Sequence, residues 1–393
     1  MSSFDVVKQS LGSILSDIGI KDKHDFTLVI NGEEIPVING RVFRAINTCA
    51  DTASATVLNN DKLKGLTRPI SYTETQVYLG GELVITGLIY KHSPRTTSEE
   101  KTCKLDIFSP AVDILDSTHF PPFEFNQVSL EDLAEEIIGG LGFTARYESD
   151  EGNEFFERVC IDPQQTIFNF FNELANQRGV LITSNEKGEV LFIRANTNGK
   201  PVETIANVTD IGAEYDGREL FSAYRTVATS PYMERKIKKN KRSGKSRTTW
   251  HQEHAIKEAI AYDSNVPASR QITFTSDNTS VDTIDRAAEW QRSKRYADAL
   301  SISVPRVGWY PPKSDELYKE NTLITLKHED LWINKEFDFL IKSVEYVLDS
   351  GGATCVLSLI PPQAYTSEEI PDIFGNKEGL GNTLKSLGLN GLV

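Results

Sequence analysis

The stretch DFTLVINGEEIPVINGRVFRAINTCADTASATV, from Asp25 to Val57, decides the fold class of this chain. Phe26, Leu28 and Ile30 alternate with polar or smaller residues, and Asn31-Gly32 follows at once. Asn-Gly between two alternating apolar runs is a strong signal for a β-hairpin. The stretch therefore predicts short antiparallel strands that each bury one face.

The same kind of pattern occurs a second time. The first run of short strands continues to Phe108 through another strand pair around Gly80-Gly81. The pattern returns between Ser301 and Pro361, where Gly351-Gly352 joins the last two predicted strands as a hairpin. Because helical patterns lie between the two runs, the sequence predicts an α+β, multidomain protein with two similar β-modules.

Length and composition exclude several classes of protein. A chain of 393 residues exceeds what one hydrophobic core usually organises, and predicts two to four domains. The hydrophobic fraction of 39% and the charged fraction of 25% are those of a soluble globular protein, and the sequence has no apolar run of about 18 residues. The first residues lack a basic leader followed by an apolar run. We therefore expect synthesis in a cytoplasm and no membrane insertion.

Two helices and a hairpin are predicted between the modules. The first helix runs from Ser129 to Gly142, with Ser129 as its N-cap. Its apolar face consists of Leu130, Leu133, Ala134, Ile137, Ile138 and Leu141. The second helix runs from Thr166 to Arg178, and strands GVLITS and EVLFIR follow it. Its apolar stripe, which we interpret as core and not as a ligand site, consists of Ile167, Phe170, Phe171 and Leu174.

No motif in the sequence predicts catalysis. A Walker sequence, GxSxG, HExxH and a GxGxxG after a strand are all absent. The glycines from Gly139 to Gly142 end a helix, so they cannot present helix N-terminal amides to a phosphate. The polar face of that helix could in principle supply paired carboxylates as in glycosidases, at Glu131, Asp132, Glu135 and Glu136. We interpret that face as solvated, and we expect a protein that is not an enzyme and has no cofactor.

Metal and redox sites are not expected either. The four cysteines form no CxxC pair, and we interpret Cys49, Cys103, Cys160 and Cys355 as reduced core residues. The spacing of His251 and His254 would place both side chains on one face of a helix, but two ligands do not make a metal site.

One strongly basic segment stands out from an acidic chain. The formal net charge is −14, yet RKIKKNKRSGKSR carries eight basic residues and no acidic one. The rest of the chain has 34 basic and 56 acidic residues. An acidic exterior repels nucleic acid, so this segment is the place where a polyanion or an acidic protein surface would dock. It has Ser243-Gly244 and no aromatic residue for base stacking, which favours a solvated, flexible loop. The candidate contact residues are Arg235, Lys236, Lys238, Lys239, Lys241, Arg242, Lys245 and Arg247.

An ordered series of segments resembles the baseplate hub proteins of contractile-tailed phages, in particular the Mu-like branch. The resemblance begins in the opening stretch and continues through QVYLGGELVITGLIYKHSPRTTSEEKTCKLDIFSPAVDILDST, SLEDLAEEIIGGLG and FNFFNELANQRGVLITSNEKGEVLFIR. It ends with TLITLKHEDLWINKEFDFLIKSVEYVLDSGGATCVLSLIPPQAY and covers roughly residues 25 to 365. The amino-terminal part of type VI secretion spike proteins is related to this family.

The resemblance implies a homotrimer in which each chain contributes two tube-like β-barrel domains. Six similar barrels would then surround a channel for genome ejection and adapt a six-fold tail tube to a three-fold central spike. The implied partners are the spike protein, the tail tube protein, other baseplate proteins, the tape-measure protein and, transiently, genomic DNA. The spike is expected to be a separate polypeptide. The implied location is the virion tail baseplate, after assembly in the host cytoplasm.

Six parts of the chain follow from this interpretation. They are an N-terminal arm (1–24), a first β-barrel domain (25–108), an α+β insertion domain (109–195), strands with the basic loop and a helix (201–300), a second β-barrel domain (301–365) completed by strands from 201–230, and a C-terminal tail (366–393). The tail is poor in core residues, which is typical of a segment that orders against a partner.

Two other functions compete with the structural hub. A tail-associated enzyme that degrades the cell wall would need a catalytic constellation or a fused lytic domain. A host-surface carbohydrate-binding module would need exposed aromatic residues in β-loops, for which Trp309-Tyr310 and Trp332 are the candidates. We interpret these aromatic residues as packed locally or at an interface.

Overall fold

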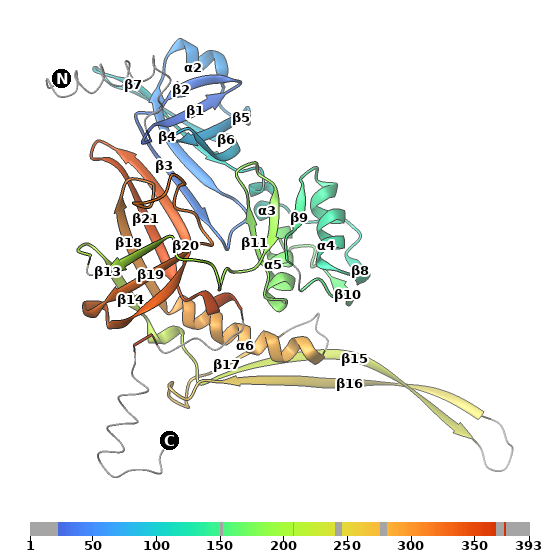
Figure 1. Ribbon diagram of the computed structural model, residues 1–393. Helices are drawn as coiled ribbons and strands as arrows, with labels where there is room; N and C mark the ends of the chain where they lie inside the picture. Colours follow the sequence, from blue (N-terminus) through green and yellow to red (C-terminus); the bar gives the residue numbers. More distant parts are fainter. Residues whose placement is uncertain are drawn as a thin grey trace, which may run out of the picture.

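Strands dominate the computed structural model of the chain (Figure 1). The structure describes residues 23–149, 152–206, 208–239, 246–275, 281–366 and 373–374. Residues 1–22 of the expected N-terminal arm and most of the C-terminal tail lie outside these ranges.

The first β-module is a seven-stranded part of a larger sheet. Its strands are β1 (Phe26–Ile30), β2 (Glu33–Pro36), β3 (Asn39–Ala45), β4 (Thr52–Leu58), β5 (Thr73–Leu79), β6 (Glu82–Thr96) and β7 (Lys101–Phe108), with helix α2 (Asp61–Leu66) between β4 and β5. Asn31 and Gly32 both have positive φ, 51° and 82°, and join β1 to β2 as the predicted tight hairpin. Phe26, Leu28 and Ile30 are fully buried, so the predicted alternation is confirmed.

A compact α+β unit follows, which we call the insertion unit. It contains α3 (Val112–Asp116), β8 (Glu124–Val128), α4 (Leu130–Leu133), the π-helix η1 (Ala134–Ile138), β9 (Ala145–Tyr147), β10 (Phe156–Cys160), α5 (Ile167–Gln177), β11 (Leu181–Ser184) and β12 (Val190–Ile193). Ser129 caps α4 with its hydroxyl group, as predicted, and the hydroxyl group of Thr166 caps α5. The predicted first helix is confirmed from Leu130 to Gly140, but Leu141 lies in the turn that follows and is 47% exposed.

The second β-module contains six strands, interrupted by a long excursion. The strands are β13 (Glu203–Ala206), β14 (Gly212–Tyr215), β18 (Leu300–Val307), β19 (Leu323–His328), β20 (Ile333–Asp349) and β21 (Gly352–Ile360). The excursion consists of β15 (Ala223–Lys239), β16 (Ser246–Tyr262), β17 (Gln271–Thr275) and α6 (Val281–Asp298). Short 3-10 turns are η2 (Gly217–Glu219), η3 (Glu329–Leu331) and η4 (Pro362–Tyr365).

The two modules have the same strand order. If β2 is set aside, β1, β3, β4, β5, β6 and β7 correspond in chain order to β13, β14, β18, β19, β20 and β21. In both modules the order across the sheet is first, fourth, fifth, sixth, third and second. One pairing differs, because β1 lies antiparallel to β5 whereas β13 lies parallel to β19. The duplication suspected from the sequence therefore extends to the topology.

The modules are joined into one 13-stranded sheet by β20. One edge of β20 pairs with β21, and the other edge is shared by two partners. Residues Ile333–Leu340 pair with β19, and after an irregularity between Ile341 and Ser343 residues Ser343–Leu348 pair with β3 of the first module. The described pairings form a path that ends at β14 and β2, so closure of each module into a barrel stays a prediction.

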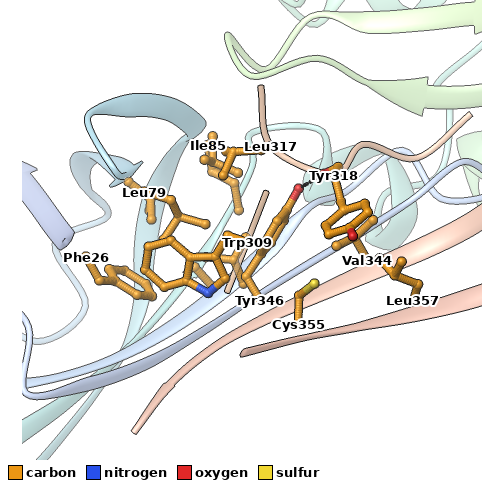
Figure 2. Packing of buried hydrophobic residues seen from close by; sticks show 14 of the residues in the cluster. Phe26, Leu79, Ile85, Trp309, Leu317, Tyr318, Val344, Tyr346, Cys355 and Leu357 are labelled. Atoms are coloured by element: carbon orange, nitrogen blue, oxygen red, sulfur yellow. Dashed lines mark hydrogen bonds between the residues drawn. The ribbon is translucent and has the colours of Figure 1, made fainter. Parts of the chain in front are cut away.

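A single hydrophobic core runs through both modules (Figure 2). At its centre Trp309 is fully buried and meets Phe26 of the first module edge-to-face, with ring centroids 6.5 Å apart. The indole N–H of Trp309 donates to the carbonyl oxygens of Thr354 and Val347 in β21 and β20, at 3.1 and 3.3 Å. Trp309 therefore attaches the first module to the second.

Part of the C-terminal tail contacts its own chain. Ile373 is 5% exposed and belongs to the shared core, and the ring of Phe374 packs edge-to-face on Tyr215 with centroids 5.1 Å apart. For these two residues the expectation of a tail that orders only against a partner is wrong, because an apolar pair anchors the tail to β14.

Trp309→Ala is predicted to lower the free energy of unfolding by about 3–5 kcal/mol, because it removes a large buried aromatic side chain between the modules. Urea unfolding followed by circular dichroism measures the effect. Trp332→Ala is the matched control, since Trp332 is 65% exposed and its loss should change the midpoint little. Equal effects of the two changes would contradict the assigned role of Trp309.

Candidate assembly sites

The excursion of the second module forms a long two-stranded arm. β15 and β16 pair antiparallel over their whole length, from Ala223 opposite Tyr262 to Lys239 opposite Ser246. In the part of the chain that the structure describes, β17 adds a third strand beside Ala223–Val227 and no further along β15. The twelve pairs beyond that point form a ribbon about 40 Å long at the usual rise per residue. Figure 1 shows this ribbon reaching away from the modules.

The base of the arm is fixed to the rest of the protein by α6. Tyr224, Ala259 and Ala261 of the arm pack with Ile284 and Ala288 of α6 in a small buried cluster. α6 also contacts α5 and η4, so it lies between the arm, the insertion unit and the second module. The arm therefore starts from a rigid base.

The basic segment lies at the far end of this arm. Arg235, Lys236, Lys238 and Lys239 belong to β15, and Arg247 belongs to β16. Lys241, Arg242 and Lys245 lie outside the described residues. The expectation of a loop is wrong for 235–239 and 246–247, whose backbone is paired in a hairpin. The histidines at 251 and 254 also lie in β16, so the helical face on which their pairing depended does not form.

A cleft of about 1050 Å³ separates the insertion unit from the arm's base and α6. Its lining includes Gln177 of α5, Trp290 of α6 and Thr226 of β15. Each of these has a buried polar side-chain atom without a hydrogen-bond partner among the described residues. Small-molecule sites are mostly apolar with a few placed polar groups, whereas this cleft is lined largely by polar side chains.

A buried cluster of three charges lies where β3, the insertion unit and the second module meet. The Arg44 guanidinium donates from Nε to Asp51 at 3.0 Å and lies 2.9 Å from a carboxylate oxygen of Glu320. It also reaches the carbonyl oxygen of Ser184 in β11, at 3.4 Å. In addition, the Thr183 hydroxyl donates to the carbonyl oxygen of Ala45 at 3.2 Å. The longest of these contacts, between Arg44 and Glu320, links residues that are 276 positions apart in the chain.

One cation therefore faces two carboxylates in a nearly dry environment. Arg44 and Asp51 are 7% and 1% exposed. Burial raises the pKa of the Asp51 carboxyl to about 7, the positive charge of Arg44 opposes this, and the negative charge of Glu320 reinforces it. Burial alone would lower the pKa of Arg44, but Asp51 and Glu320 outweigh it and hold that pKa above its usual value. Below about pH 7 the Asp51 carboxyl group therefore retains its proton in the folded protein.

The carboxylates and cysteines considered in the sequence analysis lie in surroundings that are typical of structural roles. Asp132 and Ser129 form a capping box at the start of α4, and Glu131 hydrogen-bonds Asn153 at 2.8 Å. Cys49, Cys103 and Cys355 are buried, and burial raises the pKa of Cys49 and of Cys355 to about 12, which disfavours the reactive thiolate. The expectation of a core position is wrong for Cys160, which is exposed at the end of β10.

Among the described residues, no group of three or more His, Cys, Asp and Glu side chains is arranged to hold a metal ion. None of the helices in the same ranges is long and apolar enough to cross a membrane.

Sequence reasoning missed both the arm and the charge cluster. The alternation of a buried and an exposed face is the signal for a strand, and a ribbon that stands away from the core has little need of it. Arg44, Asp51 and Glu320 are ordinary charged residues at distant positions, and no local pattern marks them.

Two protein-family descriptions match parts of the chain. Residues 111–194 match the second domain of the gp44-like baseplate hub proteins, and residues 279–368 match the fourth domain of the Mu phage baseplate assembly protein GpP. The first match covers every helix and strand of the insertion unit. The second covers α6 and β18 to η4.

Three baseplate or tail proteins are similar to the chain over most of its length. The baseplate hub protein gp44 of Escherichia phage Mu is 25% identical over 311 residues, which cover 77% of this chain and 79% of that protein. Among solved structures, the 43 kDa tail protein of prophage MuSo2 from Shewanella oneidensis has a TM-score of 0.68 at 22% identity, covering 88% of this chain and 100% of that one. A tail protein from Neisseria meningitidis MC58 has a TM-score of 0.71 at 14% identity, covering 88% and 99%.

These similarities confirm the resemblance found in the sequence. The chain is a homologue of the baseplate hub protein gp44 of phage Mu, and two of its segments match domains of baseplate hub and baseplate assembly proteins. The two tail proteins share its fold.

Asp51→Asn is predicted to change how stability depends on pH. The pKa of Asp51 is about 7 in the folded state and about 4 in the unfolded chain, so the folded state holds an extra proton between these values. This group's contribution to stability is complete below pH 4 and is lost as the pH rises through 7. The wild type should therefore lose up to about 4 kcal/mol of its free energy of unfolding between pH 4 and 7.5, and Asp51→Asn should not show this loss.

Urea unfolding at several pH values measures this difference. Asp61→Asn is the control, because Asp61 is a fully exposed aspartate on α2. Parallel stability curves for the wild type and Asp51→Asn would contradict the assignment.

Proposed function

We propose that this hub protein works as a homotrimer whose three chains place six β-modules of the same topology around a channel. The observation that carries the proposal is the repeated strand order of the two modules. Two modules per chain multiplied by a three-fold axis give six similar units. Such a ring matches a six-fold tail tube on one side and a three-fold central spike on the other.

The junction inside one chain supports this arrangement. Through β20 and β3 the second module is joined to the first edge to edge, so that one sheet continues from module to module. An edge-to-edge joint that repeats with a rotation that closes on itself produces a ring. The closure of each module into a barrel and the channel for genome ejection belong to this proposal.

The proposed partners follow from the position of a hub. They are the central spike protein, the tail tube protein, other baseplate proteins and the tape-measure protein, with genomic DNA passing transiently through the channel. The protein would be assembled in the host cytoplasm and would reside in the virion baseplate. Its role would be structural and not enzymatic, as the description of its Mu relative as a baseplate hub protein suggests.

The arm is proposed as a contact with another tail component. A two-stranded ribbon is marginally stable by itself in water, and among the described residues no third strand pairs with twelve of its residue pairs. Its far end carries positive charge on a chain with a net charge of −14. Contact with an acidic partner surface would supply the missing stabilisation.

The oligomeric state tests the main proposal. Light scattering of the purified protein should give three times 43.9 kDa, about 132 kDa, and electron microscopy of that species should show a ring with a central channel. Coexpression with the spike protein covers the case in which the spike templates the ring. A monomer under both conditions would contradict the proposal.

Replacing the eight basic residues of the arm with Gly and Ser should leave the trimer intact and reduce incorporation of the protein into baseplates. The residues are Arg235, Lys236, Lys238, Lys239, Lys241, Arg242, Lys245 and Arg247. The control exchanges eight exposed Lys and Arg residues outside the arm in the same way. Loss of the trimer in the arm variant, or unchanged incorporation, would refute the assigned role.

A further inference from the structure

Each module contains one long strand that changes neighbours halfway along. In the second module this strand is β20, with its irregularity between Ile341 and Ser343. In the first module it is β6, whose pairing with β7 has an irregularity between Ile89 and Lys91. Ile89 lies opposite Ile107 of β7, and Ile341 lies opposite Leu359 of β21. Ile89 and Ile341 therefore occupy corresponding positions in the two modules. Lys91–Thr96 therefore correspond to Ser343–Leu348.

These two corresponding segments differ in one respect. Ser343–Leu348 pair on one edge with β21 and on the other edge with β3. Among the pairings of the described residues, Lys91–Thr96 pair with β7 and with no other strand. β3 has a counterpart as well, because β14 holds the corresponding place at the end of the second module. Within the same ranges, β14 pairs with β18 alone.

We propose that β14 of one chain pairs antiparallel with residues Lys91–Thr96 of β6 in the next chain of the trimer, as β3 pairs with β20 within a chain. This inference rests on the proposed trimer and names the strands that join its subunits. Three junctions inside chains and three between chains would then alternate around one continuous sheet. The contact is head to tail, which is the type of contact that generates a closed ring.

The internal junction also predicts the register. Val344 lies opposite Arg44, and Glu345 lies opposite Phe43. Val42 of β3 lies opposite Ala53 of β4, and Ala213 of β14 lies opposite Ile302 of β18, so Val42 and Ala213 occupy corresponding positions. His92 then lies opposite Tyr215, Ser93 opposite Glu214, Pro94 opposite Ala213 and Arg95 opposite Gly212.

Charge and exposure agree with this pairing. Lys91 and Arg95 on the β6 edge are exposed, as is Glu214 on β14, which Asp216 follows in the chain. In the proposed register Lys91 lies opposite Asp216, and Arg95 lies diagonal to Glu214 on the same face. Opposite charges at such positions stabilise a pair of strands.

Pro94 is also consistent with a free edge. Proline has no N–H, and within sheets it is confined to edge strands, first positions and bulges. The docked β14 would therefore lack one hydrogen bond that β3 makes in the internal junction. This restricts the new pairing to a short segment, in agreement with the four residues of β14.

Disulfide cross-linking tests the register. Opposite residues in antiparallel strands have Cα atoms about 4.5–5.5 Å apart, within the range that a disulfide spans. In a Cys160→Ser background, which removes the exposed native thiol, Ser93→Cys/Glu214→Cys should give a covalent trimer on a non-reducing gel. The matched control is Phe43→Cys/Glu345→Cys, the same pair in the internal junction, which should cross-link without a change in mass. That control sets the oxidation conditions.

A second variant tests specificity. Ser93→Cys/Ala213→Cys shifts one position by a single residue, which places the two thiols on opposite faces of the sheet, so it should not cross-link. Charge reversal by Glu214→Arg or Arg95→Glu should weaken the trimer about two- to five-fold per junction, and the combined reversal should restore it.

The outcomes separate the two proposals. A trimer of normal mass whose Ser93→Cys/Glu214→Cys variant does not cross-link, or cross-links no better than the shifted pair, would overturn the strand assignment and leave the trimer standing. A monomer in solution, alone and with the spike protein, would instead overturn the proposed function on which this inference rests.

Discussion

The structure depends on how one edge of β20 is divided. A strand has two edges, and β20 uses the first for β21 and splits the second between β19 and β3. The irregularity near Lys342 makes the division possible, because an irregular pairing bends a strand and increases its twist. Without it β19 and β3 would compete for the same hydrogen bonds. The first module would then attach to the second only through side chains.

The buried charges at this junction serve a different purpose from the apolar core. The core formed around Trp309 supplies stability, since area removed from water stabilises whatever it packs against. Burying Arg44, Asp51 and Glu320 is costly, and replacing such groups by apolar ones often stabilises a protein. Their geometry, however, is satisfied only when β3, β11 and the segment before β19 meet in one arrangement. The cluster therefore selects one orientation of the modules among those that an apolar contact would tolerate.

Local signals were sufficient for some elements and useless for others. Asn31-Gly32 specified a hairpin because its backbone conformation is a property of two residues, and Ser129 and Thr166 marked helix starts because a cap is a contact within four residues. The strand order of the second module could not be predicted in the same way, because β14 and β18 are separated by the whole arm and α6. The pairing of β15 with β16 at the far end of the arm could not be predicted, because the sequence there is polar and basic. Such a composition is typical both of a solvated loop and of a ribbon paired with itself. The charge cluster depends on residues that only the tertiary fold brings together.

The proposed docking of β14 on β6 explains why the two edges are so poorly suited to general pairing. An exposed strand edge is a template for any other strand, and proteins protect such edges with short strands, charges and proline. β14 has four residues, and the β6 edge carries Lys91, Pro94 and Arg95. A long apolar edge would join copies in open chains as readily as in rings. A short, charged edge binds weakly at any single contact, so only a closed ring, in which all three contacts form together, holds it. The same features that keep a lone chain from aggregating therefore favour a trimer over an indefinite polymer.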